Sequence, residues 1–234
     1  MNLTPDQIIL WQRGFITINA TLVFTWLVMA LLVLFSWLVT RKLSPKISIS
    51  RGQNILEVIV LTINQQIEEI SQQKADDYLP FIGTLFIFIA VSNLLTIFPG
   101  YHPPTGSLST TVALAICVFF AVPFYGIKKQ GLLNYFKRYY LQPTPIMLPF
   151  NIIGRFSNTI SLSVRLFGNV MSGTMIVAIL LSIAPLFLPI VMQAMGLITG
   201  LIQAFIFAIL ATVFISAATQ VEAKDLNTIE ETKS

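Results

Sequence analysis

The chain has 234 residues, of which 55% are hydrophobic and only 10% are charged, and its mean hydropathy is +0.80. This composition is typical of an integral membrane protein and excludes an ordinary soluble domain. The net charge of +4 is small, and the basic residues form short clusters beside apolar segments. We therefore interpret them as topology signals and not as a surface that binds nucleic acid.

The first third of the sequence predicts an outside segment, one membrane span and one surface helix. Residues 1–13 lack the basic start and cleavage site of a signal peptide, so we expect them to persist in the mature chain as an outside segment, the location that the basic cluster after the first span implies. Residues 14–40 carry no charge and are long enough for a span, and the basic cluster that begins at Arg41 marks its cytoplasmic end. Within residues 51–74, isoleucines recur at helical spacing while Gln and Glu occupy other faces. This pattern predicts a helix that lies on the cytoplasmic surface.

Residues 78–127 predict two spans joined by an outside loop. The segment carries no charged residue, and the turn formers of FPGYHPPTGS interrupt it near the middle. His102 in this loop is the only histidine, which favours a solvated loop residue over a metal ligand. Cys117 is the only cysteine, so an intrachain disulfide and a cysteine metal cluster are both excluded, and we expect it to serve packing.

Residues 150–221 predict two long helices. The first apolar run ends near residue 183 and would be ~50 Å long as a helix, against a hydrocarbon core of ~30 Å. Pro185 and Pro189 then turn the chain into a second long run, and residues 222–234 form a polar tail. The predicted fold class is an all-α membrane protein with one N-terminal span, one cytoplasmic surface helix, a two-helix hairpin and two strongly tilted antiparallel helices.

Arg165 lies inside the longest apolar region of the sequence. A guanidinium in the middle of a bilayer costs at least ~2.5–3.5 kcal/mol, and no Asp or Glu occurs between Tyr78 and Val221. The counter-charge must therefore come from carbonyls, water, an anion or another polypeptide. Arg155, ten residues earlier, could instead extend to the interface.

Two stripes at helical spacing either serve Arg165 or only hold helices together. They are Asn158, Ser161, Arg165, Asn169 and Ser172 on the first helix, and Gln193, Gly196, Gly200, Gln203 and Phe207 on the second.

The strings SLSVRLFGN and LIQAFIF resemble subunit a of the F-type ATP synthases, the membrane stator that faces a rotating ring of c subunits. The resemblance extends to the PTP segment and to the loop PGYHPPTGSLSTTVALA. It implies that Arg165 is the stator arginine opposite the ring carboxylate, and that Asn169 and Gln203 are its polar neighbours. It also implies two offset aqueous half-channels, a c-ring, b-type stalk subunits and a catalytic ATPase head as partners, and a subunit that is not an enzyme by itself.

The same resemblance implies a place in the bacterial inner membrane, in contact with lipid, with the N-terminus outside and the C-terminus in the cytoplasm. We expect no cofactor and no resident metal. The rival interpretation from another class is a free-standing secondary transporter in which Arg165 binds an anionic substrate. A membrane enzyme is disfavoured because the apolar region contains no nucleophile and base pair.

The sequence departs from the proton-coupled pattern of this family at three positions. Thr96, Thr174 and Gly196 stand where many relatives have a carboxylate or a histidine. Hydroxyls and amides can coordinate hydrated Na⁺, so we expect Na⁺ as the coupling ion, with H⁺ carried by water as the alternative. The candidate ion-pathway residues are Asn169, Gln203, Thr174, Ser161, Asn93, Gln193 and Arg155.

Overall fold

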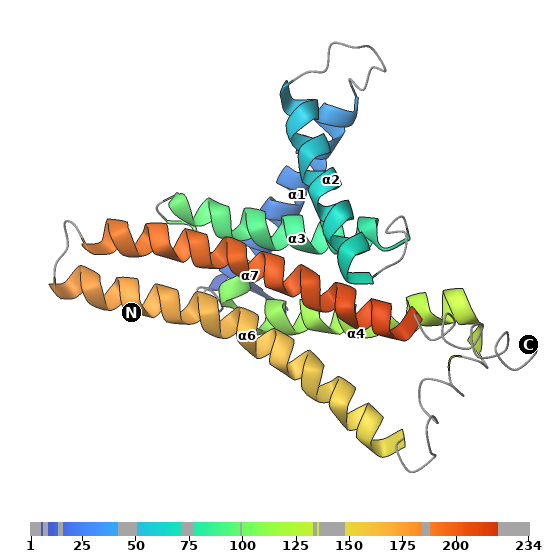
Figure 1. Ribbon diagram of the computed structural model, residues 1–234. Helices are drawn as coiled ribbons and strands as arrows, with labels where there is room; N and C mark the ends of the chain where they lie inside the picture. The colour runs from blue at the N-terminus through green and yellow to red at the C-terminus, as the bar shows by residue number, and fades with distance from the viewer. Residues whose placement is uncertain are drawn as a thin grey trace, which may run out of the picture.

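The computed structural model describes residues 6, 9–13, 16–41, 51–71, 77–98, 100–132, 135, 148–183 and 188–219. It is helical apart from one short hairpin (Figure 1). The elements are β1 (Ile9–Arg13), β2 (Ile16–Asn19), α1 (Ala20–Thr40), α2 (Arg51–Ser71), α3 (Leu79–Leu94), η3 (Leu95–Ile97), η4 (Pro104–Gly106), α4 (Leu108–Gln130), α6 (Leu148–Ile183) and α7 (Leu188–Thr219).

Five of the described helices are long and apolar enough to cross a membrane, namely α1, α3, α4, α6 and α7. The predicted class of an all-α membrane protein is therefore confirmed at that level. Helix α2 is not among the five, in keeping with its mixed sequence, in which Glu57, Glu68 and Glu69 are exposed.

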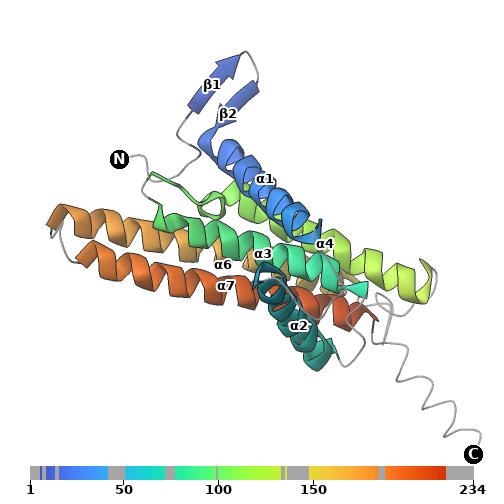
Figure 2. The same cartoon turned by 90° about the horizontal axis from the view of Figure 1, so that it is seen from above.

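The N-terminal hairpin was not predicted. Strands β1 and β2 pair antiparallel, with Arg13 opposite Ile16, and they project from the start of α1 (Figure 2). The β-branched run Ile16, Thr17 and Ile18 suits a strand. Helix α1 consequently begins at Ala20, several residues later than the predicted start of the first span at Gly14.

Helix α7 forms the centre of the bundle. It packs against α2, α3, α4 and α6, and the residues it buries are mostly small, which lets neighbouring helices approach closely. Both views show α6 running antiparallel beside it, while the first half of α6 diverges from α7 in Figure 1. The buried side chains of the core include Ile82, Leu85 and Ile89 from α3, Val118 and Val122 from α4, Leu162 and Leu166 from α6, and Ala204, Phe207, Ala211 and Ile215 from α7.

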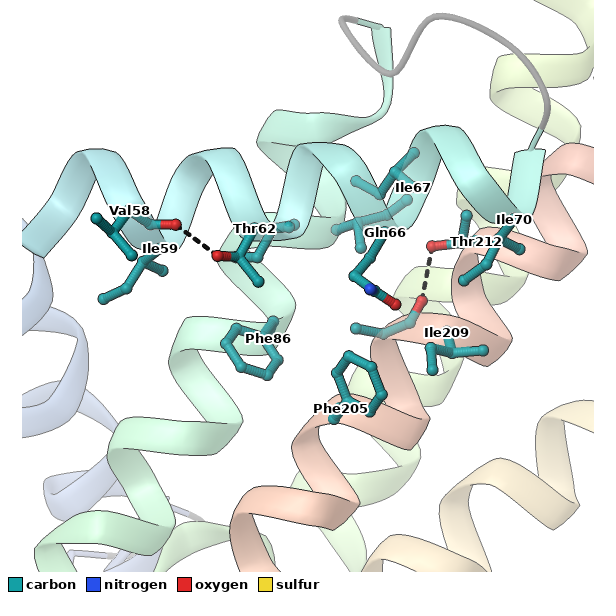
Figure 3. A pocket seen from close by; sticks show the side chains of 13 residues that line it. Val58, Ile59, Thr62, Gln66, Ile67, Ile70, Phe86, Phe205, Ile209 and Thr212 are labelled. Carbon is teal, nitrogen blue, oxygen red and sulfur yellow. Dashed lines mark hydrogen bonds between the residues drawn. The ribbon is translucent and has the colours of Figure 1, made fainter.

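Helix α2 crosses α3 and α7 at a steep angle (Figure 1). Ile63 and Ile67 are buried in this crossing. Beside them the crossing leaves an apolar cavity of about 210 Å³. Phe86 from α3 and Phe205 from α7 are among the side chains that line it (Figure 3). Two isoleucines of the predicted repeat, Ile63 and Ile67, thus lie on the packing face of this helix, whereas Ile59 is exposed.

Candidate functional site

Arg165 lies on a face of α6 that the rest of the described chain leaves open. Leu162 and Leu166, on an adjoining side of the helix, are almost completely buried, whereas Arg165 and its neighbour Val164 are exposed. In the described part of the chain, no group forms a hydrogen bond or an ion pair with Arg165. Helical spacing extends this open face over the polar residues Asn158, Ser161 and Ser172, which are exposed as well. The arginine therefore points outward from this chain.

A cavity of about 330 Å³ lies between α3, the loop that follows it, α6 and α7, and we call it the loop-side cavity. Its lining combines side chains from three stretches of the sequence, within residues 93–106, 169–181 and 192–200. Several of them carry hydroxyl, amide or imidazole groups: Asn93, Thr96, Tyr101, His102, Asn169, Thr174, Gln193 and Thr199.

The loop-side cavity brings together three residues discussed above for the choice of coupling ion, because Thr96, Thr174 and Gly196 all line it. Four of the predicted pathway residues line it too, namely Asn93, Asn169, Thr174 and Gln193. Three others, Ser161, Gln203 and Arg155, lie elsewhere. Thr199 and Tyr101 were not predicted, since only the folded chain brings them to this cavity.

The amides at this cavity tie helices together. Asn93 is buried on α3, where its Nδ2 donates to the carbonyl of Gly200 at 2.9 Å and its Oδ1 accepts from Thr105 at 3.1 Å. Gln193 Nε2 donates to the carbonyl of Thr96 at 2.7 Å. These bonds join α3 and its loop to α7. Asn169 Nδ2 on α6 makes a longer bond of 3.4 Å to the carbonyl of Thr199.

Gly200 is required for this close approach. A Cβ added there would lie 2.9 Å from the Cβ of Asn93, which is shorter than real side chains allow. The predicted small-residue stripe of α7 is thus a contact with α3 at this point. Gly196, one turn earlier, faces open space.

The titratable groups described at this cavity are Tyr101 and His102. Burial raises the pKa of the Tyr101 phenol above its ordinary value, against a smaller lowering by Ser92, so the phenol stays protonated near neutral pH. His102 lies in the loop, as expected, but it is partly buried: it lines the cavity, and its ring centroid is 6.4 Å from that of Phe24. No carboxylate lines the described part of this cavity.

Gln203 does not bond to Arg165. It is buried on α7, and its Nε2 has no hydrogen-bond partner among the described residues. Its neighbour Phe207 is completely buried, so this part of the α7 stripe belongs to the core. Its role as a polar neighbour of the arginine, which the family resemblance implies, stays a prediction.

A second, smaller cavity of about 50 Å³ lies between α4, α6 and Phe214, and we call it the Arg155 cavity. Arg155, Asn158 and Thr159 supply its polar lining. Arg155 is half-buried, and its Nη1 donates to Tyr135 Oη at 3.1 Å, so the guanidinium has a specific partner within this chain. Nothing in the sequence singled out Tyr135.

Cys117 lies on an exposed face of α4, so the expectation that it serves packing is not met within this chain. Within the described ranges, no group of three or more metal-ligating side chains occurs.

Comparison with known proteins gives a consistent result over nearly the whole chain. The family described as the ATP synthase A chain matches residues 22–216. ATP synthase subunit a 2 of Acaryochloris marina is 68% identical over 231 residues, which cover 99% of this chain and 98% of the relative. Subunit a 1 of Crocosphaera subtropica is 59% identical over 224 residues, covering 96% and 97%. Subunit a of Nitrosospira multiformis is 58% identical over 219 residues, covering 94% and 87%.

Proposed function

Because the chain belongs to the ATP synthase subunit a family, we propose that it is an ion-translocating stator subunit in which Arg165 faces the carboxylates of a rotating c-ring. Members of this family are non-catalytic membrane subunits of the synthase complex, so the chain is not an enzyme by itself. The observation that supports the role of Arg165 is its exposed position on α6 without an intrachain partner in the described part.

The electrostatics of such a pairing are favourable. A carboxylate ~4 Å from the guanidinium would gain roughly 4 kcal/mol at an effective dielectric constant of ~20, which is comparable to the ~2.5–3.5 kcal/mol that burying the arginine costs. The same charge favours the ionised form of the ring carboxylate, which then releases its cation opposite Arg165. Elsewhere the carboxylate faces lipid and has to be neutralised by a bound cation.

The two cavities suggest separate routes to the ring. Asn169, which lines the loop-side cavity, is four residues and ~6 Å along α6 from Arg165, and Asn158, which lines the Arg155 cavity, is seven residues and ~10 Å away on the other side. We assign the loop-side cavity to the outer half-channel and the Arg155 cavity to the inner one. Arg165 stands between them and opposes a direct leak of cations. A monovalent cation that passes through both half-channels down the membrane potential releases ~2.3 kcal/mol of free energy for each 100 mV.

The proposal also gives the topology of the chain in a bacterial inner membrane. In it the N-terminus lies outside, the C-terminus lies in the cytoplasm, and α2 lies on the cytoplasmic surface. The c-ring, b-type stalk subunits and the catalytic head are the partners. Labelling of cysteines introduced at positions 102 and 129 from each side tests this, and the first is expected to react from outside and the second from inside.

The first test is Arg165→Ala in the assembled complex, reconstituted into vesicles. ATP-driven ion uptake is expected to fall to background while the c-ring still copurifies, because the side chain supplies a charge and hardly any packing. Cys117→Ala, another exposed side chain of the apolar region, is the matched control and should transport normally. Uptake at the wild-type rate in Arg165→Ala would overturn the proposal.

A free-standing anion transporter would need Arg165 to face a cavity of its own chain. The exposed position of Arg165 gives no support to that alternative. Saturable anion uptake by the isolated chain would nevertheless revive it.

We propose Na⁺ as the coupling ion. The support is a loop-side cavity whose described lining offers hydroxyl and amide oxygens but no carboxylate, and a tyrosine that stays protonated. The test is ATP hydrolysis at alkaline pH with and without NaCl, together with ²²Na⁺ uptake in the presence of a protonophore. Stimulation by NaCl and uptake that survives the protonophore are expected, and hydrolysis indifferent to NaCl would favour H⁺.

A further inference from the structure

Immediately after α4 the chain turns back on itself. Gly131 has φ of 80°, a conformation that side chains with a Cβ rarely adopt, and its N–H donates to the carbonyl of Ile127 at 2.8 Å. The N–H of Tyr135 then donates to the carbonyl of Gly131 at 3.0 Å. This turn brings Tyr135 back beside the last turns of α4.

The ring of Tyr135 packs where α4 has no side chain. A Cβ added to Gly126 would clash with Cε2 and Cδ2 of Tyr135, and the ring is completely buried. Gly126 therefore provides the surface on which the ring rests. An alanine there would force the ring to move.

The hydroxyl of Tyr135 faces α6. Arg155 Nη1 donates to it at 3.1 Å, and the guanidinium carbon lies 6.0 Å from the centroid of the tyrosine ring. Arg155 belongs to the first half of α6, which diverges from α7 in Figure 1. Packing against α4 then has to hold this half in place, and the Arg155 cavity lies in that contact.

We propose that Gly126, Tyr135 and Arg155 form a clamp that fixes the first half of α6 on α4 and thereby sets where Arg165 is presented to its partner. Arg155 and Arg165 are ten residues apart on one helix, or ~15 Å. A pivot of α6 at the clamp would displace Arg165 and also change the width of the Arg155 cavity. Arg155 is thus a positioning residue, and this inference rests on the proposed stator role of Arg165.

The direct test measures the distance between α4 and α6 in the assembled complex. Nitroxide labels at Phe124→Cys and Phe156→Cys, both exposed positions, report this distance by pulsed electron paramagnetic resonance in a Cys117→Ala background with the cysteines of other subunits replaced. Gly126→Ala is expected to shift or broaden the distance distribution. Labels at Thr84→Cys on α3 and Val213→Cys on α7 should report no change.

Function is measured in the same preparations without labels. Gly126→Ala should lower the number of ions transported per ATP hydrolysed several-fold, and Tyr135→Phe should lower it less, because it keeps the ring and loses only the hydroxyl. Gly154→Ala is the matched control, since its Cβ meets nothing within 4 Å and it adjoins Arg155. Arg155→Lys should also lower this ratio of ions to ATP, because an ammonium lacks the planar guanidinium that lies over the ring.

An unchanged α4 to α6 distance in Gly126→Ala would overturn the clamp, whatever happens to transport. If that variant does not assemble, the distance in Tyr135→Phe decides the question in the same way. Failure of the stator role itself would appear differently, as wild-type uptake in Arg165→Ala.

Discussion

Helices α6 and α7 are both long, apolar and free of carboxylates, yet they are buried to very different extents. About 44% of the apolar stretch of α7 is buried inside the chain, against 6% for α6. The small residues of α7 let α3 and α4 approach it, so α7 completes the fold of this subunit. Helix α6 keeps its polar stripe and its arginine on the open side. Similar hydropathy thus accompanies internal packing in α7 and, under the proposed stator role, an interface with another polypeptide in α6.

The change expected to have the largest effect after removal of the arginine is Arg165→Lys. The charge is kept, but a compact ammonium lacks the planar fork and loses its proton more easily when it is desolvated. We expect the rate of ATP-driven uptake to fall by about tenfold or more. This corresponds to a rise of ~1.4 kcal/mol or more in the activation free energy of the rotation step. Uptake close to wild type, in complexes that hold a normal amount of c-ring, would mean that α6 needs only a positive charge.

Gly200→Leu tests the α7 side of the comparison. Already the first side-chain carbon would meet Asn93 at 2.9 Å, so a leucine should prevent normal packing of α7 on α3 and impair assembly. Gly200→Ala should assemble but lose about 1–3 kcal/mol of stability through overpacking. Thermal unfolding of the purified complex measures this. Gly83→Ala is the matched control, because that buried glycine on α3 has nothing within 4 Å of its Cβ.

A pair of asparagines separates stability from transport. Asn93→Ala removes two buried hydrogen bonds and leaves the carbonyl of Gly200 and the hydroxyl of Thr105 to find new partners, at a cost of about 1–3 kcal/mol. Asn169→Ala removes only the longer bond to Thr199, so it should hardly change stability and should instead lower the uptake rate. Thermal unfolding and uptake are compared for both variants. The reverse order of effects would mean that α6 is part of the internal scaffold.

The helices were predictable from the sequence because uninterrupted apolar runs set their lengths. The second half of the chain is the clearest example, where Leu148–Ile183 and Leu188–Thr219 follow the two predicted runs closely. The exposed position of Arg165 also agrees with the absence of any Asp or Glu between Tyr78 and Val221 that could pair with it. The hairpin at Ile9–Asn19 escaped prediction, because Ile16, Thr17 and Ile18 continue the apolar pattern of the helix that follows.

The details of the site depend on contacts between residues far apart in the sequence. Asn93 bonds to Gly200, 107 positions away, and Arg155 bonds to Tyr135, which the turn at Gly131 brings beside α4. Helical spacing placed Gln203 on a polar stripe, but spacing alone does not say which neighbour that stripe meets. In the fold the Gln203 side chain is buried, and its Nε2 has no hydrogen-bond partner among the described residues.

The smallest effect is expected for Cys117→Ala. Cys117 is exposed on α4, and its neighbours Ile116 and Phe120 are exposed and apolar as well. A face of this kind suits contact with lipid tails, which are as apolar as leucine and tolerate the loss of one thiol. We expect a change in stability within ±0.5 kcal/mol and normal uptake, as is usual for surface positions without a specific contact. A clear loss of assembly would show that this face of α4 meets a protein partner, and the open face of α6 would then no longer be the distinguishing interface of the subunit.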